Sequence, residues 1–378
     1  MSKWKRIKLR DICDLNMGQS PKSSSYNQDG DGIPFYQGNA DFGETHPKTR
    51  YYCSQPTKIA HKGDILLSVR APIGALNIAT ETCCIGRGLA SISARKDLSD
   101  MKFLYYVLRG KNAELNQKGT GSTFKAINKK NLSELWCPLP PLEAQRKIAE
   151  TLDTVSEILA MRKQQLAELD NLIKSIFYDM FGDPVGNEKG LEKRKLGDLG
   201  VIKSGGTPSR ARPAFFKGKV PWITTVALGE TFIDDNDAVE FITEDAIKNS
   251  STKQIKANSI LFGIRVGVGK TSINRIPMCT NQDIVAIENI NKDLLHQVFL
   301  IKTLTTFTEY FSEQKRGATI KGITTGILKS IEIPIPPLAS QTRFANLNSL
   351  IEDHKSLVRK ALDETQYLLD SLMSRYFD

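Results

Sequence analysis

The chain has few of the residues from which metal sites and disulfide frameworks are built. Its 378 residues include six cysteines and four histidines. The cysteines stand at positions 13, 53, 83, 84, 137 and 279 without a Cys-x-x-Cys pair, and the histidines are equally scattered. Such spacing argues against a disulfide scaffold and against a structural zinc site. We therefore expect reduced cysteines and no metal ion in this chain.

The sequence also lacks long apolar runs. No stretch reaches the roughly 18 apolar residues that a membrane-spanning helix needs, and the run that begins at Ile65 is interrupted at Arg70. The charged residues 1–6 are not followed by the apolar segment of a secretion signal. With 40% hydrophobic and 25% charged residues, the composition is that of a soluble globular protein. At roughly 150 residues per domain, we expect two or three domains, a cytoplasmic location and no contact with a membrane.

Motifs of catalysis are missing as well. The segment Gly267–Ser272 resembles a phosphate-binding loop, but Ile264 stands where that motif requires glycine. Pro-Pro occurs only at 140–141 and 336–337, without the Asn or Asp and the aromatic residue that accompany it in base methylation. We predict a strand followed by a turn at 267–272 and no catalytic residue. Metal-dependent nuclease sites have a looser pattern, so a chain that cuts or methylates DNA by itself stays open as an alternative.

The sequence does contain an internal repeat. A shift of 187 residues aligns Lys8–Ile12 with Lys195–Leu199, and a shift of 196 aligns Pro138–Gln145 with Pro334–Gln341. The second pair shares the pattern Pro-x-Pro-Pro-Leu-x-x-Gln. This period is far longer than a solenoid unit, so the chain consists of two related halves in tandem.

Each half ends in a predicted long helix. Proline and glycine are absent from Leu142 to Phe181, and apolar residues recur there at alternating spacings of four and three, broken only at Arg162. The seam residues of this helix are Ile148, Leu152, Val155, Leu159, Leu166, Leu169 and Ile173; those of residues 338–378 are Ile351, Val358, Leu362, Leu369 and Leu372. Asn348, Lys355 and Thr365 interrupt the second seam. This spacing predicts coiled-coil helices. Each helix could instead cover its own domain, but two equivalent helices that end equivalent halves favour packing on each other.

The charge is divided along the repeat. The whole chain carries 52 basic and 42 acidic side chains. Residues 1–141 have 21 basic and 12 acidic side chains, a net +9, and residues 182–337 have 21 and 17, a net +4. The predicted helices carry −2 and −1. The segments between the helices, which we predict to form short strands and turns, are therefore the candidates for contact with a polyanion.

This layout resembles the DNA-specificity (S) subunit of type I restriction-modification systems. The resemblance covers essentially the whole chain and rests on Lys-Leu-x-Asp and Gly-x-(Ser/Thr)-Pro near the start of each half, together with the proline-rich motif before each helix. It implies an α+β fold in which two tandem mixed α/β target-recognition domains, 1–141 and 182–337, are separated by two long helices. These helices, 142–181 and 338–378, would form an antiparallel coiled coil with pseudo-two-fold symmetry. Each domain would read half of a bipartite site in double-stranded DNA.

The resemblance also implies partners. The helices would set the spacing of the domains and dock two modification (methyltransferase) subunits, and the complex would recruit restriction (helicase and nuclease) subunits. S-adenosylmethionine, ATP and Mg²⁺ would be bound by those partners, so this chain would hold no cofactor and be non-catalytic. Two alternatives from other classes remain: a coiled-coil scaffold without a DNA role, and a nucleotide-binding switch that depends on Lys270.

Candidates for DNA contact follow from side-chain chemistry. Arg, Lys, Asn and Gln can form paired hydrogen bonds with base edges, and Ser or Thr can support them. The candidates in the first half are Ser20, Lys22, Tyr36, Gln37, Asn39, Arg70 and Lys125; those in the second half are Thr207, Ser209, Arg210, Arg212, Thr224, Thr225, Arg265 and Lys321. A shift of 195 places Arg70 on Arg265. Because the two halves should read different bases, this identity favours a phosphate or structural role for both arginines.

Overall fold

The computed structural model describes residues 4–120, 125–308, 310–311 and 322–377. The chain forms two compact units: unit 1 consists of residues 1–164 and 358–378, and unit 2 of residues 165–357. Helices α5 (Leu142–Phe181) and α11 (Leu338–Phe377) each contribute to both units.

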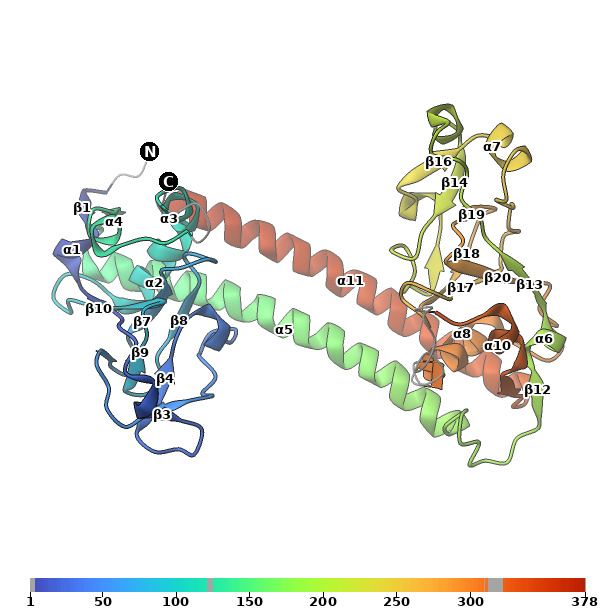
Figure 1. The fold of residues 1–378 in the computed structure, drawn as a ribbon, viewed down its shortest axis with the longest axis horizontal. Helices are drawn as coiled ribbons and strands as arrows, with labels where there is room; N and C mark the ends of the chain where they lie inside the picture. Colours follow the sequence, from blue (N-terminus) through green and yellow to red (C-terminus); the bar gives the residue numbers. More distant parts are fainter. Residues whose placement is uncertain (1–3, 121–124, 309, 312–321, 378) are drawn as a thin grey trace. The chain divides into compact units, whose positions relative to one another are not determined.

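Unit 1 contains two sheets and several short helices (Figure 1). One sheet has the order β2 (Cys13–Met17), β10 (Leu89–Ala94), β7 (Ile65–Ser68), β8 (Leu76–Ile78), and the other β3 (Tyr26–Asn27), β5 (Tyr52–Cys53), β4 (Ile33–Tyr36), β9 (Cys83–Ile85), β6 (Ile59–Ala60). A third pairing joins β1 (Arg6–Lys8) to β11 (Trp136–Pro138). The helices are α1 (Leu9–Ile12), α2 (Met101–Gly110), α3 (Asn112–Gln117) and α4 (Lys129–Ser133), with 3₁₀ turns η1 (Ser23–Ser25) and η2 (Asn39–Asp41).

Unit 2 repeats this plan. One sheet has the order β13 (Val201–Ser204), β20 (Ile284–Glu288), β17 (Ile260–Gly263), β18 (Thr271–Asn274), β15 (Phe232–Ile233), and the other β16 (Glu240–Ile242), β14 (Val220–Ile223), β19 (Cys279–Thr280). Strand β12 (Lys193–Lys195) pairs with β21 (Glu332–Pro334). The described helices are α6 (Leu196–Leu199), α7 (Glu244–Lys248), α8 (Gln297–Thr306) and α10 (Thr325–Ser330), with 3₁₀ turns η3 (Pro213–Phe216) and η4 (Asp235–Asp237).

The repeat extends to strand register. The paired residues are Ala90 with Met17 and Phe35 with Cys84 in unit 1, and Val285 with Ser204 and Trp222 with Cys279 in unit 2. A shift of 187 residues converts Met17 to Ser204 and Phe35 to Trp222, and a shift of 195 converts their partners Ala90 and Cys84 to Val285 and Cys279. The two units are therefore duplicates at the level of single backbone pairings, which confirms the predicted tandem α+β architecture.

The two long helices pack on each other within each unit. In unit 1, Leu152 and Leu159 of α5 share a core with Leu369 and Phe377 of α11. In unit 2, Phe177 of α5 and Phe344 of α11 lie in one core, with ring centroids 5.4 Å apart. Since the first part of α5 meets the end of α11 and the last part of α5 meets its start, the helices are antiparallel, as predicted.

Three of the residues that interrupt the predicted seam, Arg162, Lys355 and Thr365, find polar partners, whereas the buried Oδ1 of Asn348 has none among the described residues. Arg162 of α5 donates hydrogen bonds to the carbonyl oxygen of Ala361 and to the hydroxyl of Thr365 on α11. Lys355 is buried, and its Nζ lies 2.6 Å from Oδ1 of Asp170 on α5. A buried cation is tolerated only when it is paired, so these contacts fix where the two helices meet.

The glutamine of the repeated proline-rich motif is a structural residue in both units. Gln145 accepts a hydrogen bond from the backbone N–H of Asp100 (2.9 Å) and donates to the carbonyl oxygens of Leu98 (3.0 Å) and Pro140 (2.9 Å). Gln341 accepts from His296 (2.8 Å) and donates to Leu294 (2.9 Å) and Pro336 (2.7 Å). Both glutamines are fully buried. Each amide therefore ties the start of a long helix to the segment before α2 or α8.

The caps of α2 and α8 differ in chemistry at the same position. The carboxylate of Asp100 caps α2 by accepting from the N–H of Phe103 (3.0 Å), whereas Nδ1 of His296 caps α8 by accepting from Val298 (3.2 Å). Burial lowers the pKa of His296 below its ordinary value of 6.5. A protonated imidazole cannot accept at Nδ1, and its charge opposes the helix dipole.

We therefore expect unit 2 to lose about 1 kcal/mol of stability as the solution is acidified. A histidine whose pKa is lowered by folding contributes its stability fully above pH 6.5, and this contribution is lost as the pH falls through the lower folded value. Denaturant unfolding at pH 7.5 and 5.5 measures the loss. The variant His296→Asp, which copies the cap of unit 1, should remove this part of the pH dependence; an unchanged dependence would contradict the assignment.

Candidate nucleic-acid interface

The loop Gly86-Arg87-Gly88 joins β9 to β10 and contacts several of the predicted DNA-binding segments. The N–H of Gly88 donates to the carbonyl oxygen of Gln37 (3.1 Å), and the N–H of Arg87 donates to the hydroxyl of Ser20 (3.4 Å). The carbonyl oxygen of Gly88 accepts from Val69, beside Arg70 (2.9 Å). This loop therefore brings together segments that lie far apart in the sequence.

Close backbone contacts require glycine both in this loop, at Gly88, and at Gly18, which lies against Gly86. A Cβ atom on Gly88 would lie 2.3 Å from the carbonyl oxygen of Gln37, and one on Gly18 would lie 2.2 Å from the carbonyl oxygen of Gly86. Only glycine permits such an approach. The loop is thus held tightly at its base, while the side chain of Arg87 is exposed.

Arg70 and Lys125 lie beside this loop. Arg70 forms an antiparallel bridge with Ala126, and the N–H of Ala71 donates to the carbonyl oxygen of Lys125 (3.2 Å). Both basic side chains are exposed. We refer to Ser20, Gln37, Arg70, Arg87 and Lys125 as the loop cluster of unit 1.

Unit 2 has the matching arrangement around Gln282, which joins β19 to β20. The hydroxyl of Thr207 donates to Oε1 of Gln282, and an ion pair of 3.8 Å joins Arg265 to Asp283. We refer to Thr207, Arg265, Gln282 and Asp283 as the loop cluster of unit 2. Lys321, which we predicted to be the counterpart of Lys125, lies outside the described residues.

Arg210 is held by aromatic rings and a carboxylate. Its guanidinium lies 4.2 Å from the ring centroid of Phe216 and 5.3 Å from that of Trp222, and its Nη2 lies 2.7 Å from Oε2 of Glu240. The hydrogen bond from Arg210 lowers the pKa of Glu240. Because the Arg210 side chain is still 58% exposed, it can be presented to a ligand in a fixed orientation. Arg212 lies over Phe215, 5.4 Å from the ring centroid.

The other candidates differ in accessibility. Lys22 and Ser209 are exposed, and Asn39 and Thr224 are half-buried. Tyr36 and Thr225 are buried, at 1% and 5% exposure, and the Tyr36 hydroxyl lies 2.9 Å from that of Thr49. A side chain enclosed in this way cannot reach a base edge. The structure therefore corrects our prediction for both residues: Tyr36 belongs to a buried core cluster, and the side chain of Thr225 is buried.

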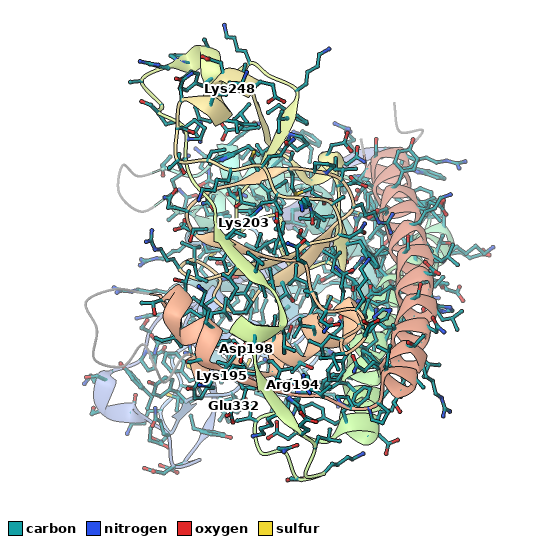
Figure 2. All side chains as sticks on the ribbon, turned by 90° about the vertical axis from the view of Figure 1, so that its right-hand side faces the viewer. Arg194, Lys195, Asp198, Lys203, Lys248 and Glu332 are labelled. Atoms are coloured by element: carbon teal, nitrogen blue, oxygen red, sulfur yellow. The ribbon has the colours of Figure 1, made fainter. Side chains whose placement is uncertain are left out.

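Other basic residues of unit 2 lie opposite acidic residues on the strands. Lys195 of β12 stands opposite Glu332 of β21, and Nζ of Lys203 lies 2.5 Å from the buried carboxylate of Glu288. Figure 2 shows both lysines on the path from β12 to β13, with Lys248 farther away on α7. Carboxylates therefore partly neutralise this strand edge, as Asp283 does Arg265 in the loop cluster, so charge alone does not favour either surface of unit 2.

Arg87 and Gln282 were missed by the sequence prediction. The signal was present, because a shift of 195 residues aligns them and also aligns Arg70 with Arg265. It was obscured because the shift changes from 187 to 195 within the domain, and because the residues around Arg87 and Gln282 differ between the halves.

The described residues offer no site for a metal ion. No group of three His, Cys, Asp or Glu side chains in the ranges given above is placed to hold one. Gly267 and Gly269, both with positive φ, form the turn between β17 and β18, which is the predicted strand-to-turn arrangement and precedes a strand, not the helix of a phosphate-binding loop. Among the described residues, no helix combines the length and apolar character needed to cross a membrane.

Both halves of the duplicated sequence match one known protein family. The family described as "Type I restriction modification DNA specificity domain" matches residues 1–171 and again residues 188–355. The chain belongs to this family. As a member of the type I specificity family, it has one family domain per half of the repeat.

Several curated relatives, each described as a type I specificity subunit, are similar to this chain. A putative type I restriction enzyme MjaX specificity subunit of Methanocaldococcus jannaschii is 43% identical over 160 residues, which are 42% of this chain and 38% of the relative. The MjaIX specificity subunit of the same organism is 28% identical over 68% of this chain and 65% of its own length. The EcoR124I/EcoR124II specificity subunit of Escherichia coli is 25% identical over 72% and 70%. The chain thus aligns with less than two thirds of the first two relatives.

Solved structures support the fold of the specificity family. The crystal structure of a type I restriction-modification S subunit from M. genitalium covers 100% of this chain and 96% of its own, with a TM-score of 0.64 and 17% identity. A chain from a structural study of complex assembly and conformational transition in the type I system covers 99% and 97%, with a TM-score of 0.62 and 17% identity. At such identity the likeness concerns the fold alone.

Proposed function

We propose that this subunit reads a bipartite site in double-stranded DNA, with one half-site contacted by the loop cluster of each unit. The observation that carries the proposal is the duplicated loop frame, in which equivalent backbone segments present different exposed side chains. Phosphate contacts position a protein on DNA, and base contacts give specificity. Arg70 and Arg265 are the same residue type at equivalent positions of the two units, so they suit phosphate contacts.

The proposal includes partner subunits. Leu350 and Leu357 of α11 are each 67% exposed and stand seven residues apart. Two exposed leucines at heptad spacing on a helix offer a second apolar stripe beside the seam, which suits a partner helix. We assign this stripe, Leu350 and Leu357, to a modification (methyltransferase) subunit, with restriction subunits joining the assembled complex.

The chemistry would then reside on the partners. Apart from the carboxylate of Asp283, which is paired with Arg265, the loop clusters contain cationic, amide and hydroxyl side chains, which suit recognition and offer no arrangement of nucleophile and base. We propose that this chain is non-catalytic and cytoplasmic, and that S-adenosylmethionine, ATP and Mg²⁺ are bound by the partner subunits.

Exchange of a recognition domain tests the bipartite assignment. Residues 182–337 are replaced by the corresponding segment of a relative, and the chimera is assembled with its modification subunits. We expect one half-site of the methylated sequence to change and the other to stay, because each unit carries its own loop cluster. The measurement is a map of methylated sites in DNA from a host without other methyltransferases. The reciprocal exchange of residues 1–141 is the control, and a simultaneous change of both half-sites would refute modular reading.

A further inference from the structure

We propose that Arg87 and Gln282 are specificity-determining residues, which read a guanine in the half-site of unit 1 and an adenine in the half-site of unit 2, respectively. The inference rests on the proposed reading of DNA by the loop clusters. It adds the two side chains that make the units read different bases and the class of base that each recognises.

The first support is the identical backbone frame of the two loops. Four hydrogen bonds recur at equivalent positions: Gly18 to Leu89 (2.8 Å) and Gly205 to Ile284 (3.0 Å); Gln19 to Ile85 (3.0 Å) and Gly206 to Thr280 (2.9 Å); Gly86 to Tyr36 (2.8 Å) and Asn281 to Ile223 (3.0 Å); Val69 to Gly88 (2.9 Å) and Ile264 to Asp283 (2.8 Å). In each pair the N–H of the first residue donates to the carbonyl oxygen of the second. The side chains of Arg87 and Gln282 therefore project from equivalent positions of the two units.

The second support is the contrast between exposure and anchoring. The residues before Arg87 and Gln282, Gly86 and Asn281, are buried, whereas Arg87 and Gln282 are exposed. None of the backbone hydrogen bonds of this frame depends on the side chain at either position. At such a position the backbone is anchored while the residue type can change. A domain that reads DNA can then alter the base it recognises without a change in its fold.

The third support is the chemistry of the two side chains. Arginine pairs with O6 and N7 of guanine, and glutamine pairs with N6 and N7 of adenine, each through two hydrogen bonds. The carbonyl oxygen of Gln282 already accepts from Thr207 and retains a second lone pair for the adenine amino group. Thr207 also fixes the direction of the amide. We therefore assign Thr207 as a positioning residue for Gln282.

The test exchanges the two side chains in the complex of this chain with its modification subunits. We expect Arg87→Gln to change one guanine to adenine in one half-site and to lower affinity for the original site about ten- to a hundredfold. Gln282→Arg should make the reverse change in the other half-site. The readouts are the map of methylated sites and binding to matched duplexes. Thermal unfolding should be unchanged, because both side chains are exposed.

The matched controls are Arg70→Gln and Arg265→Gln, which remove the same charge from neighbouring positions. They should weaken binding on all sequences to a similar degree and leave the methylated sequence unaltered. Thr207→Val should reduce discrimination at the Gln282 base, and Thr207→Ser, which keeps the hydroxyl, should restore it. Such a rescue would not follow from a purely structural role.

The outcomes separate the two proposals. If the wild-type complex methylates a bipartite site and Arg87→Gln leaves that sequence unaltered, or weakens all sequences equally, the base-reading role of Arg87 is wrong. Likewise, if Gln282→Arg leaves the methylated sequence unaltered or weakens all sequences equally, the base-reading role of Gln282 is wrong. If the wild-type complex shows no bipartite site, the proposed function itself fails.

Discussion

Substitution of Gln341 by leucine should destabilise unit 2 by about 3–5 kcal/mol. The buried amide satisfies the N–H of His296 and the carbonyl oxygens of Leu294 and Pro336. Leucine has a similar size but leaves these three backbone groups without a partner, and each buried polar group left unpaired costs about 1–3 kcal/mol. The loss also releases the start of α11 from the segment that precedes α8.

Tryptophan fluorescence during denaturant unfolding is a suitable measurement. Trp222 is buried in unit 2, whereas Trp4 and Trp136 of unit 1 are exposed, at 37% and 48%. The change in emission therefore follows mainly unit 2. The control is Thr342→Ala, an exposed position next in sequence, which should change stability by no more than about 0.5 kcal/mol. Gln145→Leu should lower the stability of unit 1 by a similar amount. If Gln341→Leu is as stable as the wild type, the stabilising role of the amide is refuted.

Substitution of both Leu350 and Leu357 by glutamate should abolish assembly with the modification subunits. Burial of one leucine contributes about 1.5–3 kcal/mol, so the loss of two lowers affinity at least about a hundredfold, and the buried charges lower it further. Because both side chains are 67% exposed, the variant should fold normally. Sedimentation velocity of the mixed subunits without DNA measures assembly.

A matched pair of substitutions provides the control. Val226 and Val239 are exposed apolar residues of unit 2 outside the helices, at 82% and 87%. The change of both to glutamate adds the same charge and removes similar apolar surface, but should leave assembly intact. If both double variants lose assembly equally, or if neither loses it, Leu350 and Leu357 do not form the docking site for the modification subunit.

The sequence was most informative where structure is local. The spacing of Leu152, Val155 and Leu159 predicts a helix because it repeats with the helical turn, and α5 indeed extends from Leu142 to Phe181. The polar interruptions were visible, but their partners were not. Arg162 and Thr365 are 203 residues apart, and no local pattern predicts such a pairing.

The candidate site was harder to predict because side-chain type does not reveal exposure. Tyr36 and Thr225 have polar atoms, but both are buried. Arg87 is exposed for a reason that depends on the fold, since the glycines on either side of it press against the backbone of Gln37. Arg210 was predicted as a candidate for DNA contact together with its neighbours Thr207, Ser209 and Arg212, but its partners Phe216 and Glu240 became visible only in the structure.

The anchoring of the loop between β9 and β10 has an evolutionary consequence. Its hydrogen bonds use backbone atoms and the Ser20 hydroxyl, so substitutions at Arg87 should be nearly neutral for folding. A single codon could then vary freely among residue types without the loss of stability that most mutations cause. With the proposed base-reading role of Arg87, new recognition sequences can arise at this position at little cost in stability, and lineages can diverge in target while they keep the same fold.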